Sequence, residues 1–417
     1  MWRILVLASL LVVGSGSSVA QTTCSNVGNA NTLYCLPILV VQNLHVSGSA
    51  VIPTVPPAFS ALNSAVGIQT SEVPAPSPAS GIAYMFSSSA FTRERELGPI
   101  FSERPGTVGK HKLYLAVAYQ FFRFDQIDEV PLNEIPLQIN GCDIKLAACG
   151  NFIQTRSELD LRVHQFTIYA TFGLTNRLDL SFAIPLLDVR MRMRTTCSTC
   201  FQQQPGGNVL TFVPNSGVAT AVGVGDFTVR IKGNVIRAEH VGLALGIDIR
   251  TPTGNALDYL GSGAVGLRSF AAVAYRRRLS PHANIGYQVN GESILASASQ
   301  SGKQRLPISF DYTAGIDLSL LHSLSLTSDM LGQTYFDTSR ARLGSRAGGG
   351  LNAPDISCSV SSATTCDSER FNTTTLAGGA KFNPSGNFLI TANVLLKLDH
   401  KGLHYKPAPM ISVSYTF

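Results

Sequence analysis

The segment Ile411-Ser-Val-Ser-Tyr-Thr-Phe417 ends the chain with strictly alternating apolar and polar side chains. Successive side chains of an extended strand point to opposite faces, so the four apolar residues share one face and the three hydroxyl residues share the other. Such a strand suits a position between lipid on one side and a polar lumen on the other. The alternation therefore predicts a membrane-spanning β-strand.

The composition is consistent with many strands of this kind. Charged residues make up 14% of the 417 residues, against roughly 25% in soluble domains. The chain is rich in glycine, serine and threonine and lacks an apolar run long enough for a spanning helix. The formal charge of +6 is spread along the sequence without a basic block, so we expect no nucleic-acid partner.

The two ends of the chain predict export. Trp2-Arg3, the apolar run Ile4 to Val13 and the small residues Ser18-Val19-Ala20 predict a signal peptide over residues 1–20, cleaved after Ala20. A terminal Phe417 with Tyr415 two residues before it resembles the C-terminal signal of bacterial outer-membrane β-barrels, which the barrel assembly machinery reads. We therefore expect a bacterial outer-membrane location, with the assembly machinery, outer-membrane lipid and lipopolysaccharide as partners.

Alternating stretches recur over residues 110–417, and the spacers between them alternate in length. Short turns are expected at 175–177, 238–240, 280–282, 321–323 and 384–386, and long connections at 124–157, 195–222, 251–263, 297–305, 338–370 and 400–407. Outer-membrane barrels combine short periplasmic turns with long outer loops. The pattern predicts an all-β fold, a transmembrane antiparallel up-and-down β-barrel of about 12 strands. A barrel of 14 strands is the alternative if Ile82, Tyr84 and Phe86 begin a further hairpin.

The same alternation assigns charged residues to the lumen. Over 226–235, Arg230 and Lys232 alternate with Val229 and Ile231, and a lysine or arginine facing lipid near the midplane costs about 2–4 kcal/mol. Ion pairing and anchoring of a plug are the structural alternatives to a role in solute selectivity. The candidate lumen-lining residues are Arg230, Lys232, Asp248, Arg250, Arg268, Asp311, Asp317 and Asp329.

Two local patterns predict irregular packing. Arg190, Arg192 and Arg194 share a face that matches the earlier part of their strand only after a change of phase, and Pro185 is expected to mark a bulge there. The lumenal face Gly242, Ala244 and Gly246 leaves room for a packed segment.

Residues 21–109 form a Pro/Ser/Gly-rich segment. Its prolines prevent a regular lipid-facing strand through most of this range. We expect the segment to plug the barrel; a disordered periplasmic leader and an extra hairpin are the alternatives.

The eight cysteines fall into four close pairs, which predict local disulfides because an exported chain meets an oxidising periplasm. A redox or zinc half-site at Cys197-x-x-Cys200 lacks a second ligand pair, and no phosphate-binding loop or cluster of metal ligands is evident, so no cofactor or metal is expected. The pairs are Cys24 with Cys35, Cys142 with Cys149, Cys197 with Cys200, and Cys358 with Cys366.

Two stretches resemble known barrels. Thr251-Pro-Thr-Gly-Asn255 followed by Leu260-Gly-Ser-Gly263 resembles a loop of the phenol-degradation MetA-pathway group, which is similar to FadL-type channels. The segment from Leu97 to Arg104, then Thr107-Val-Gly109 and Tyr119 to Asp125, resembles the barrel entry of uncharacterised members of that broad group. The resemblance covers residues 80–417 and implies a channel for fatty acids or aromatic hydrocarbons with an N-terminal hatch. The flanking glycines and Pro252 are also accounted for by a tight loop without any ligand.

The sequence thus favours a passive outer-membrane channel for small hydrophobic or aromatic solutes. A structural or adhesive barrel with disulfide-linked outer loops is the main alternative. An outer-membrane lipid hydrolase is disfavoured because His164 and the other histidines lack a recognisable nucleophile context, so we expect no enzyme.

Overall fold

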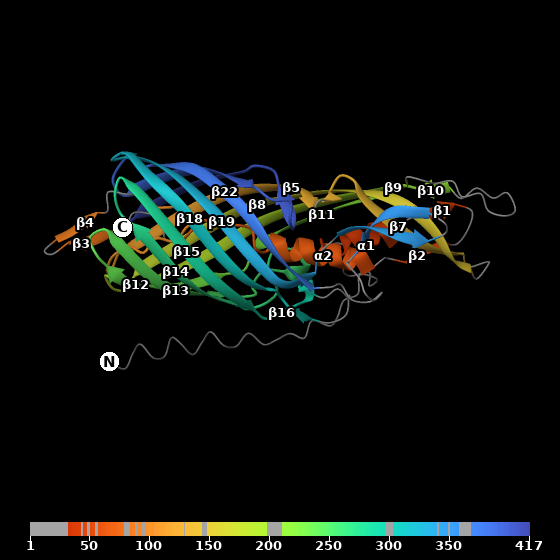
Figure 1. Cartoon of the computed structure of the whole chain (residues 1–417), viewed down its shortest axis with the longest axis horizontal. Coiled ribbons are helices and arrows are strands. Elements are labelled where there is room, and N and C mark those ends of the chain that lie inside the picture. Colours follow the sequence, from red (N-terminus) through yellow and green to blue (C-terminus); the bar gives the residue numbers. More distant parts are fainter. Residues whose placement is uncertain are drawn as a thin grey trace.

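The protein is a closed antiparallel β-barrel of 12 strands in the computed structural model (Figure 1). Each strand pairs with the next along the chain, and the last pairs with the first to close the barrel. The structure describes residues 32–42, 45–47, 51–54, 57–78, 84–87, 90–93, 97–128, 130–143, 148–197, 211–296, 303–339, 342–348, 351–357 and 368–417. The predicted signal peptide lies outside this described part.

The barrel strands are, in order, β5 (Leu113–Ile127), β8 (Ala148–Gly173), β9 (Leu178–Cys197), β11 (Asn215–Val224) with β12 (Thr228–Arg237), β13 (Val241–Arg250), β14 (Gly266–Tyr275), β15 (Leu279–Asn290), β18 (Ile308–Leu321), β19 (Leu324–Ser339), β22 (Ser368–Phe382), β23 (Phe388–Lys397) and β25 (Ala408–Thr416). β11 and β12 both pair with β9, so together they form one interrupted strand. The hairpin β3 (Tyr84–Ser87) and β4 (Ala90–Arg93) pairs internally and adds no strand to the barrel. The 14-strand alternative is therefore wrong.

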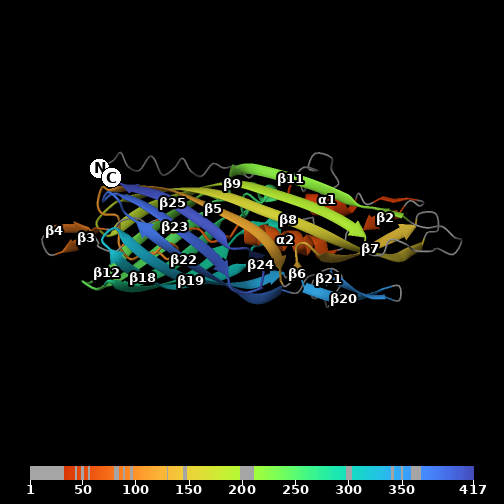
Figure 2. The same cartoon turned by 90° about the horizontal axis from the view of Figure 1, so that it is seen from above.

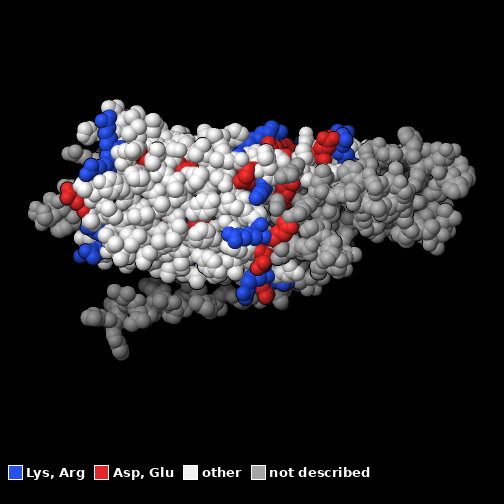
Figure 3. All heavy atoms as spheres, in the orientation of Figure 1, with Lys and Arg blue, Asp and Glu red and all other residues white. Residues whose placement is uncertain are grey.

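The terminal strand has the predicted orientation. Tyr415 and Phe417 are exposed on the outside, whereas Ser414 and Thr416 are buried toward the lumen. The backbone N–H of Phe417 donates to the carbonyl oxygen of Leu113 at 2.8 Å, which ties the chain end to the first strand. On the face shown in Figure 3, exposed apolar side chains form a broad belt with few charged atoms between two groups of charged residues. Such a belt places the barrel in an outer membrane.

We refer to the rim that carries Phe417 as the periplasmic rim and to the opposite end as the outer end, following the topology rule for these barrels. β8 and β9 continue far beyond the membrane belt at the outer end (Figures 1 and 2). There they form a wall with β11 and with β7 (Ile135–Asp143), and β2 (Val51–Thr54) pairs with the edge of β7.

The side-chain pattern of β9 inverts along this wall without a change of phase. Nearer the periplasm, the inward residues Asp179 and Ser181 are polar; nearer the outer end, the inward residues Met191 and Met193 are apolar and the intervening Arg192 is exposed. The pairing of β8 with β9 runs through Pro185 without interruption. The predicted phase change is therefore wrong: the surroundings change from lipid outside to water outside, while the faces stay the same.

The irregularity at Pro185 belongs to the neighbouring strand. β11 ends at Val224 and β12 begins at Thr228, and between them the Gly225 N–H donates to the Pro185 carbonyl oxygen at 2.8 Å. A tertiary amide has no N–H to offer the partner strand. The break therefore falls opposite the proline instead of within its own strand.

Three predicted connections differ from the structure. Residues 280–282 lie in β15, with Pro281 opposite Ile316, and the actual turn precedes them at 276–278. The spacer 124–157 contains β7 and the start of β8, and 195–222 contains most of β11. The last two errors came from treating the outer wall, where the apolar face turns inward, as loop.

Two helices fill the outer end of the barrel. α1 (Leu36–Gln42) packs against β9 and β11, and α2 (Pro57–Thr70) lies beside it, closer to the barrel (Figure 2). Their buried side chains join one core with inward residues of the outer wall, including Leu161, Val189 and Met191. No helix in the described part of the chain is long and apolar enough to cross a membrane.

The remaining described elements are short. They are β1 (His45–Ser47), β6 (Val130–Pro131), β10 (Thr211–Val213), β16 (Glu292–Ser293), β17 (Gln304–Arg305), β20 (Arg342–Gly348), β21 (Leu351–Ser357), β24 (Leu403–Tyr405) and the 3₁₀ turns Ala256–Asp258 and Ile294–Ala296.

Candidate permeation site in the lumen

A cavity of about 360 Å³ lies inside the barrel between the N-terminal segment and the wall. The segment contributes residues 70–78 together with Phe101 and Glu103. The wall contributes both charged and apolar side chains, which include Arg230, Arg250, Arg268, Asp248, Leu187 and Leu331. Cavities of this size accommodate small organic molecules.

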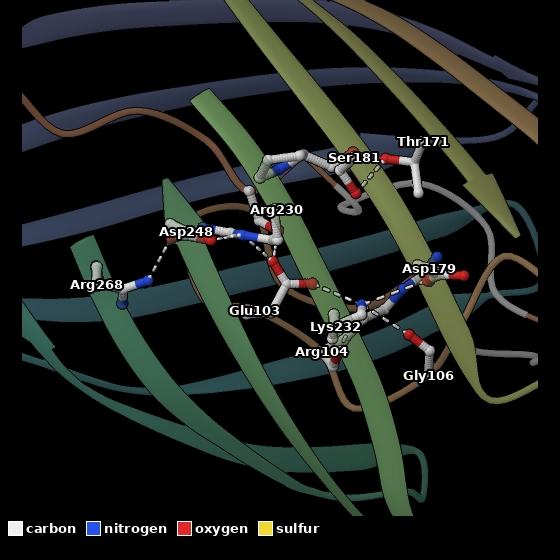
Figure 4. A network of polar contacts seen from close by, with 12 residues as sticks. Glu103, Arg104, Gly106, Thr171, Asp179, Ser181, Arg230, Lys232, Asp248 and Arg268 are labelled. Carbon is white, nitrogen blue, oxygen red and sulfur yellow. Dashed lines mark hydrogen bonds and ion pairs between the residues drawn. The ribbon is translucent and has the colours of Figure 1, made fainter. Parts of the chain in front are cut away.

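A row of alternating charges crosses the wall of this cavity (Figure 4). Arg230 donates to both carboxylate oxygens of Asp248, at 2.6 and 2.7 Å, and Arg268 donates to Asp248 at 3.0 Å. Arg268 also donates from Nε to Asp311 at 2.8 Å. β15 lies between β14 and β18, and its Gly286 makes this last pair possible, because a Cβ there would lie 2.5 Å from Asp311 Oδ1 and 2.7 Å from Arg268 Nε.

Glu103 joins the N-terminal segment to this row. Its carboxylate, 4% exposed, accepts hydrogen bonds from Arg230, from Lys232 Nζ at 2.7 Å and from the Ser77 hydroxyl at 2.5 Å. Burial alone would raise the pKa of the Glu103 carboxyl, but Lys232 and Arg230 hold it at about 2. Glu103 is therefore ionised and fully paired, which is the arrangement a buried carboxylate requires.

Lys232 extends the attachment along the same segment. Its Nζ also donates to the carbonyl oxygens of Arg104 at 3.1 Å and Gly106 at 2.9 Å, and the Asn234 amide donates to the Pro105 carbonyl oxygen at 2.6 Å. A Cβ on Gly242 would lie 2.8 Å from the Pro105 ring, so the space predicted on this lumenal face is occupied by the N-terminal segment. At Gly246 the space is occupied by the Phe270 ring.

The opposite side of the wall binds the same segment. Asp329 accepts hydrogen bonds from the Phe101 backbone N–H at 3.3 Å and the Ser102 hydroxyl at 3.2 Å. His282 lies between Asp329, 2.5 Å from its Nε2, and Asp317, 3.4 Å from its Nδ1. Residues 97–103 are thus attached to strands on both sides of the lumen.

Two further contacts complete this attachment. Lys381 donates to the carbonyl oxygens of Leu97 at 3.0 Å and Pro99 at 2.7 Å. Asp179 accepts from the Val108 backbone N–H at 3.2 Å and lies 3.8 Å from Lys232. Polar contacts with lumenal side chains are therefore spread along the whole stretch from Leu97 to Val108.

Glu72 occupies the outer side of the cavity. Its carboxylate accepts from the side-chain amides of Gln288 at 3.1 Å and Gln333 at 2.9 Å, and Arg250 lies 3.6 Å away. Burial raises the pKa of the Glu72 carboxyl, because these partners only partly offset the loss of water. The N-terminal segment thus carries two carboxylates with opposite pKa shifts, one on each side of the cavity.

The eight candidate lumen residues all lie in this region. Arg230, Arg250, Arg268, Asp248 and Asp311 line the cavity. Lys232 and Asp329 are buried in contact with residues 101–106, and Asp317 is buried 3.4 Å from His282. Sequence reasoning missed Glu72, Glu103, Asp179, His282 and Lys381. Strand alternation carries a signal for Asp179 and Lys381, but Glu72 and Glu103 lie in a stretch without periodicity.

The loop that carried the family resemblance has a structural role in the described chain. Asp226 accepts hydrogen bonds from the backbone N–H groups of Gly254 at 3.1 Å and Ser262 at 2.7 Å. A Cβ on Gly261 would lie 2.2 Å from Asp226 Oδ1. The glycines therefore let the loop fold tightly over this carboxylate.

The cysteine predictions are only partly within the described residues. Cys35 is disulfide-bonded, while its predicted partner Cys24 lies outside the described part. Cys142 and Cys149 are direct partners in the register of β7 and β8. Cys200, Cys358 and Cys366 also lie outside it, so the four pairings stay predictions. In the described residues, no group of three or more His, Cys, Asp or Glu side chains is arranged to hold a metal ion.

No protein-family model and no curated protein matches the sequence. Among solved structures, the chain is similar to a COG4313 outer membrane channel from Pseudomonas putida F1, with 14% identity over 74% of this chain and 96% of that one and a TM-score of 0.47. It is also similar to the NanC porin (6% identity, 72% and 98% coverage, TM-score 0.37) and to a Pseudomonas aeruginosa FadL homologue (10% identity, 74% and 90% coverage, TM-score 0.31). All three scores are low, so the fold assignment rests on the strand topology of the chain itself.

Proposed function

We propose that the protein is a passive outer-membrane channel whose lumen is narrowed by its own N-terminal segment. The observation that carries the proposal is the cavity between residues 70–78 and the charged row on β12, β13 and β14. A barrel built only as a scaffold has no need of a cavity lined by paired charges. Residues 97–108, attached through Glu103, Asp329 and Lys381, would act as the plug.

The solute class follows from the mixed lining of the cavity. Apolar groups from Pro74, Pro76, Phe101 and Leu331 face a wall of arginines and aspartates that already pair with one another. Paired charges offer an incoming ion little net attraction. We therefore propose small solutes with an aromatic or apolar body, which would contact the apolar part of the lining.

Conductance across planar bilayers tests the channel. In the Glu103→Gln variant, the plug loses its charge-assisted bonds to Arg230 and Lys232, so we expect a larger conductance than in the wild type. The matched control is Glu239→Gln, which makes the same chemical change at an 87% exposed side chain in the turn after β12 and should leave conductance unchanged.

Proteoliposomes test the solute class. Uptake of a small aromatic alcohol should exceed uptake of a pentose in the wild type, and Glu103→Gln should increase uptake of both. Equal uptake of the two solutes in the wild type would contradict the proposed solute class but not the channel.

A sealed structural or adhesive barrel is the second candidate. The helices α1 and α2 favour it, because their apolar side chains close the outer end with a core like that of a soluble protein. Absence of both conductance and solute uptake in the wild type and in Glu103→Gln would contradict the channel and support this alternative.

A further inference from the structure

The outer wall carries a sharp boundary between aromatic and charged side chains on its outward face. Tyr119, Phe121, His164 and Phe166 form the last aromatic group: the Tyr119 and Phe166 rings lie 4.7 Å apart and the Phe121 and His164 rings 4.6 Å apart. Aromatic groups of this kind mark the membrane interface in barrels. The boundary therefore lies at the height of the lipid headgroups.

Arginines begin directly above this aromatic group. In the register of the sheet, Arg123 on β5 lies opposite Arg162 on β8, and Arg162 lies opposite Arg190 on β9. Arg192 and Arg194 follow on the outward face of β9 and are exposed. Like charges directly opposite each other across strands are unfavourable, so three aligned arginines need counter-charges.

The protein supplies only part of those counter-charges. Arg162 donates to Asp160 at 2.6 Å and Arg190 donates to Asp188 at 2.9 Å, and each carboxylate lies on the same strand as its arginine. Arg123 shares Asp160, which lies 3.6 Å away. Two further carboxylates lie on this outward face: Glu158, opposite Arg194 in the register, and Asp125 on β5, which lies 2.7 Å from His404. The Arg192 side chain makes no hydrogen bond or ion pair with another residue of the described chain. Five arginines thus face four carboxylates, one of which is paired with His404, and the surface keeps positive charge.

We propose that this surface, defined by Arg123, Arg162, Arg190, Arg192 and Arg194, binds the phosphate groups of the glycolipid that forms the outer leaflet, the lipid A part of lipopolysaccharide. Its phosphates lie at the boundary between acyl chains and water, which is the height of the arginine row. Guanidinium groups bind phosphate with paired, charge-assisted hydrogen bonds. The apolar residues beneath the row would contact the acyl chains of the same molecule. The inference does not depend on the channel.

The test compares two double variants of the full-length barrel in detergent. Arg190→Gln/Arg192→Gln removes two charges from the proposed surface, and Arg277→Gln/Arg278→Gln removes two exposed charges from the turn between β14 and β15 at the periplasmic rim. Purified bisphosphorylated lipid A is the probe, and native mass spectrometry measures its binding. The heat-dependent shift in gel mobility confirms that each variant forms a barrel.

We expect the surface variant to bind lipid A at least about tenfold more weakly than the wild type, equivalent to about 1.4 kcal/mol, and the rim variant to bind as the wild type does. Enzymatic removal of the lipid A phosphates should weaken binding to the wild type and have little effect on the surface variant. The proposal is overturned if both double variants bind lipid A equally, or if dephosphorylated lipid A binds the wild type as tightly as the intact lipid. Tighter binding of a phosphate-free acidic polysaccharide would also count against it and favour an adhesive role.

Discussion

At the residue scale, the lumen depends on close approaches between charged side chains. Arg268 reaches Asp311 across an intervening strand only because Gly286 has no side chain. Glu103 is held by cations from one strand while Asp329 holds the adjacent backbone from another. Individual side chains therefore hold both the charged row and the N-terminal segment in place.

Gly286→Ala is expected to lower stability. The added methyl would lie within 2.7 Å of both members of the Arg268–Asp311 pair, and forced repacking of this kind costs about 1–3 kcal/mol. Urea unfolding of the detergent-folded barrel measures the change. The control is Gly378→Ala on β22, where no atom lies within 4 Å of the added methyl and no loss is expected.

The contact made by Glu103 is expected to depend on acid pH. Its pKa is lowered from 4.5 to about 2 in the folded protein, so its ionised form stabilises the fold above pH 4.5 and this stabilisation disappears as the pH falls toward 2. Unfolding free energies at pH 7 and pH 3 should differ less in Glu103→Gln than in the wild type. Glu72 acts in the opposite direction: burial raises its pKa, so acid reduces the cost of its burial. An equal pH dependence in the variant and the wild type would show that Glu103 does not contribute.

At the scale of the element, β9 shows how one strand serves two environments. Its inward face changes from Asp179 and Ser181 to Met191 and Met193, while its outward face changes from apolar residues to arginines. The strand geometry is the same in the membrane-spanning part and in the outer wall, and only the surroundings of each face differ between the two parts. α1 supplies the apolar contact that the inward methionines require.

Adjacent positions on β9 should therefore respond in opposite ways. Met191→Ala removes a side chain that is 1% exposed and is expected to cost about 2–5 kcal/mol. Arg192→Ala, one residue further on, faces water and should change stability little. Comparable losses at both positions, measured by urea unfolding, would contradict the proposed inversion of faces.

At the scale of the whole molecule, three layers follow one another along the lumen. An apolar helical layer lies at the outer end, the cavity lies in the middle, and residues 97–108 lie toward the periplasmic rim. The first layer and the last are held differently, one by hydrophobic burial and the other by ion pairs and hydrogen bonds. Salt and acid should therefore affect the last layer more than the first.

Deletion of residues 32–78 tests this arrangement. The shortened barrel would expose Leu161, Val189 and Met191 to the lumen, so we expect increased binding of a hydrophobic dye together with increased conductance. A deletion variant that forms a barrel with unchanged conductance would contradict the view that this segment narrows the lumen.

The barrel could be predicted from the sequence because lipid on one side and the lumen on the other impose a regular alternation of apolar and polar side chains on each strand. This alternation correctly identified Arg230 and Asp311 as inward residues and Tyr415 as an outward residue. It failed where the medium changes: Arg190 to Arg194 suggested a phase change, and Ser280 and His282 suggested a turn although they are inward residues of β15. Glu72 and Glu103 were not identified because a proline-rich segment takes its conformation from the barrel that surrounds it, and its own sequence has no period.

The aromatic and arginine rows on β5, β8 and β9 also fix the depth at which the barrel sits. A shift by one residue pair toward the periplasm would bring Arg123, Arg162 and Arg190 into the edge of the hydrocarbon, where the cost of a charged side chain rises with depth. A shift the other way would lift Phe166 and its neighbours into water. The protein is thus held at one immersion depth, which keeps its outer wall clear of the bilayer and its cavity within it.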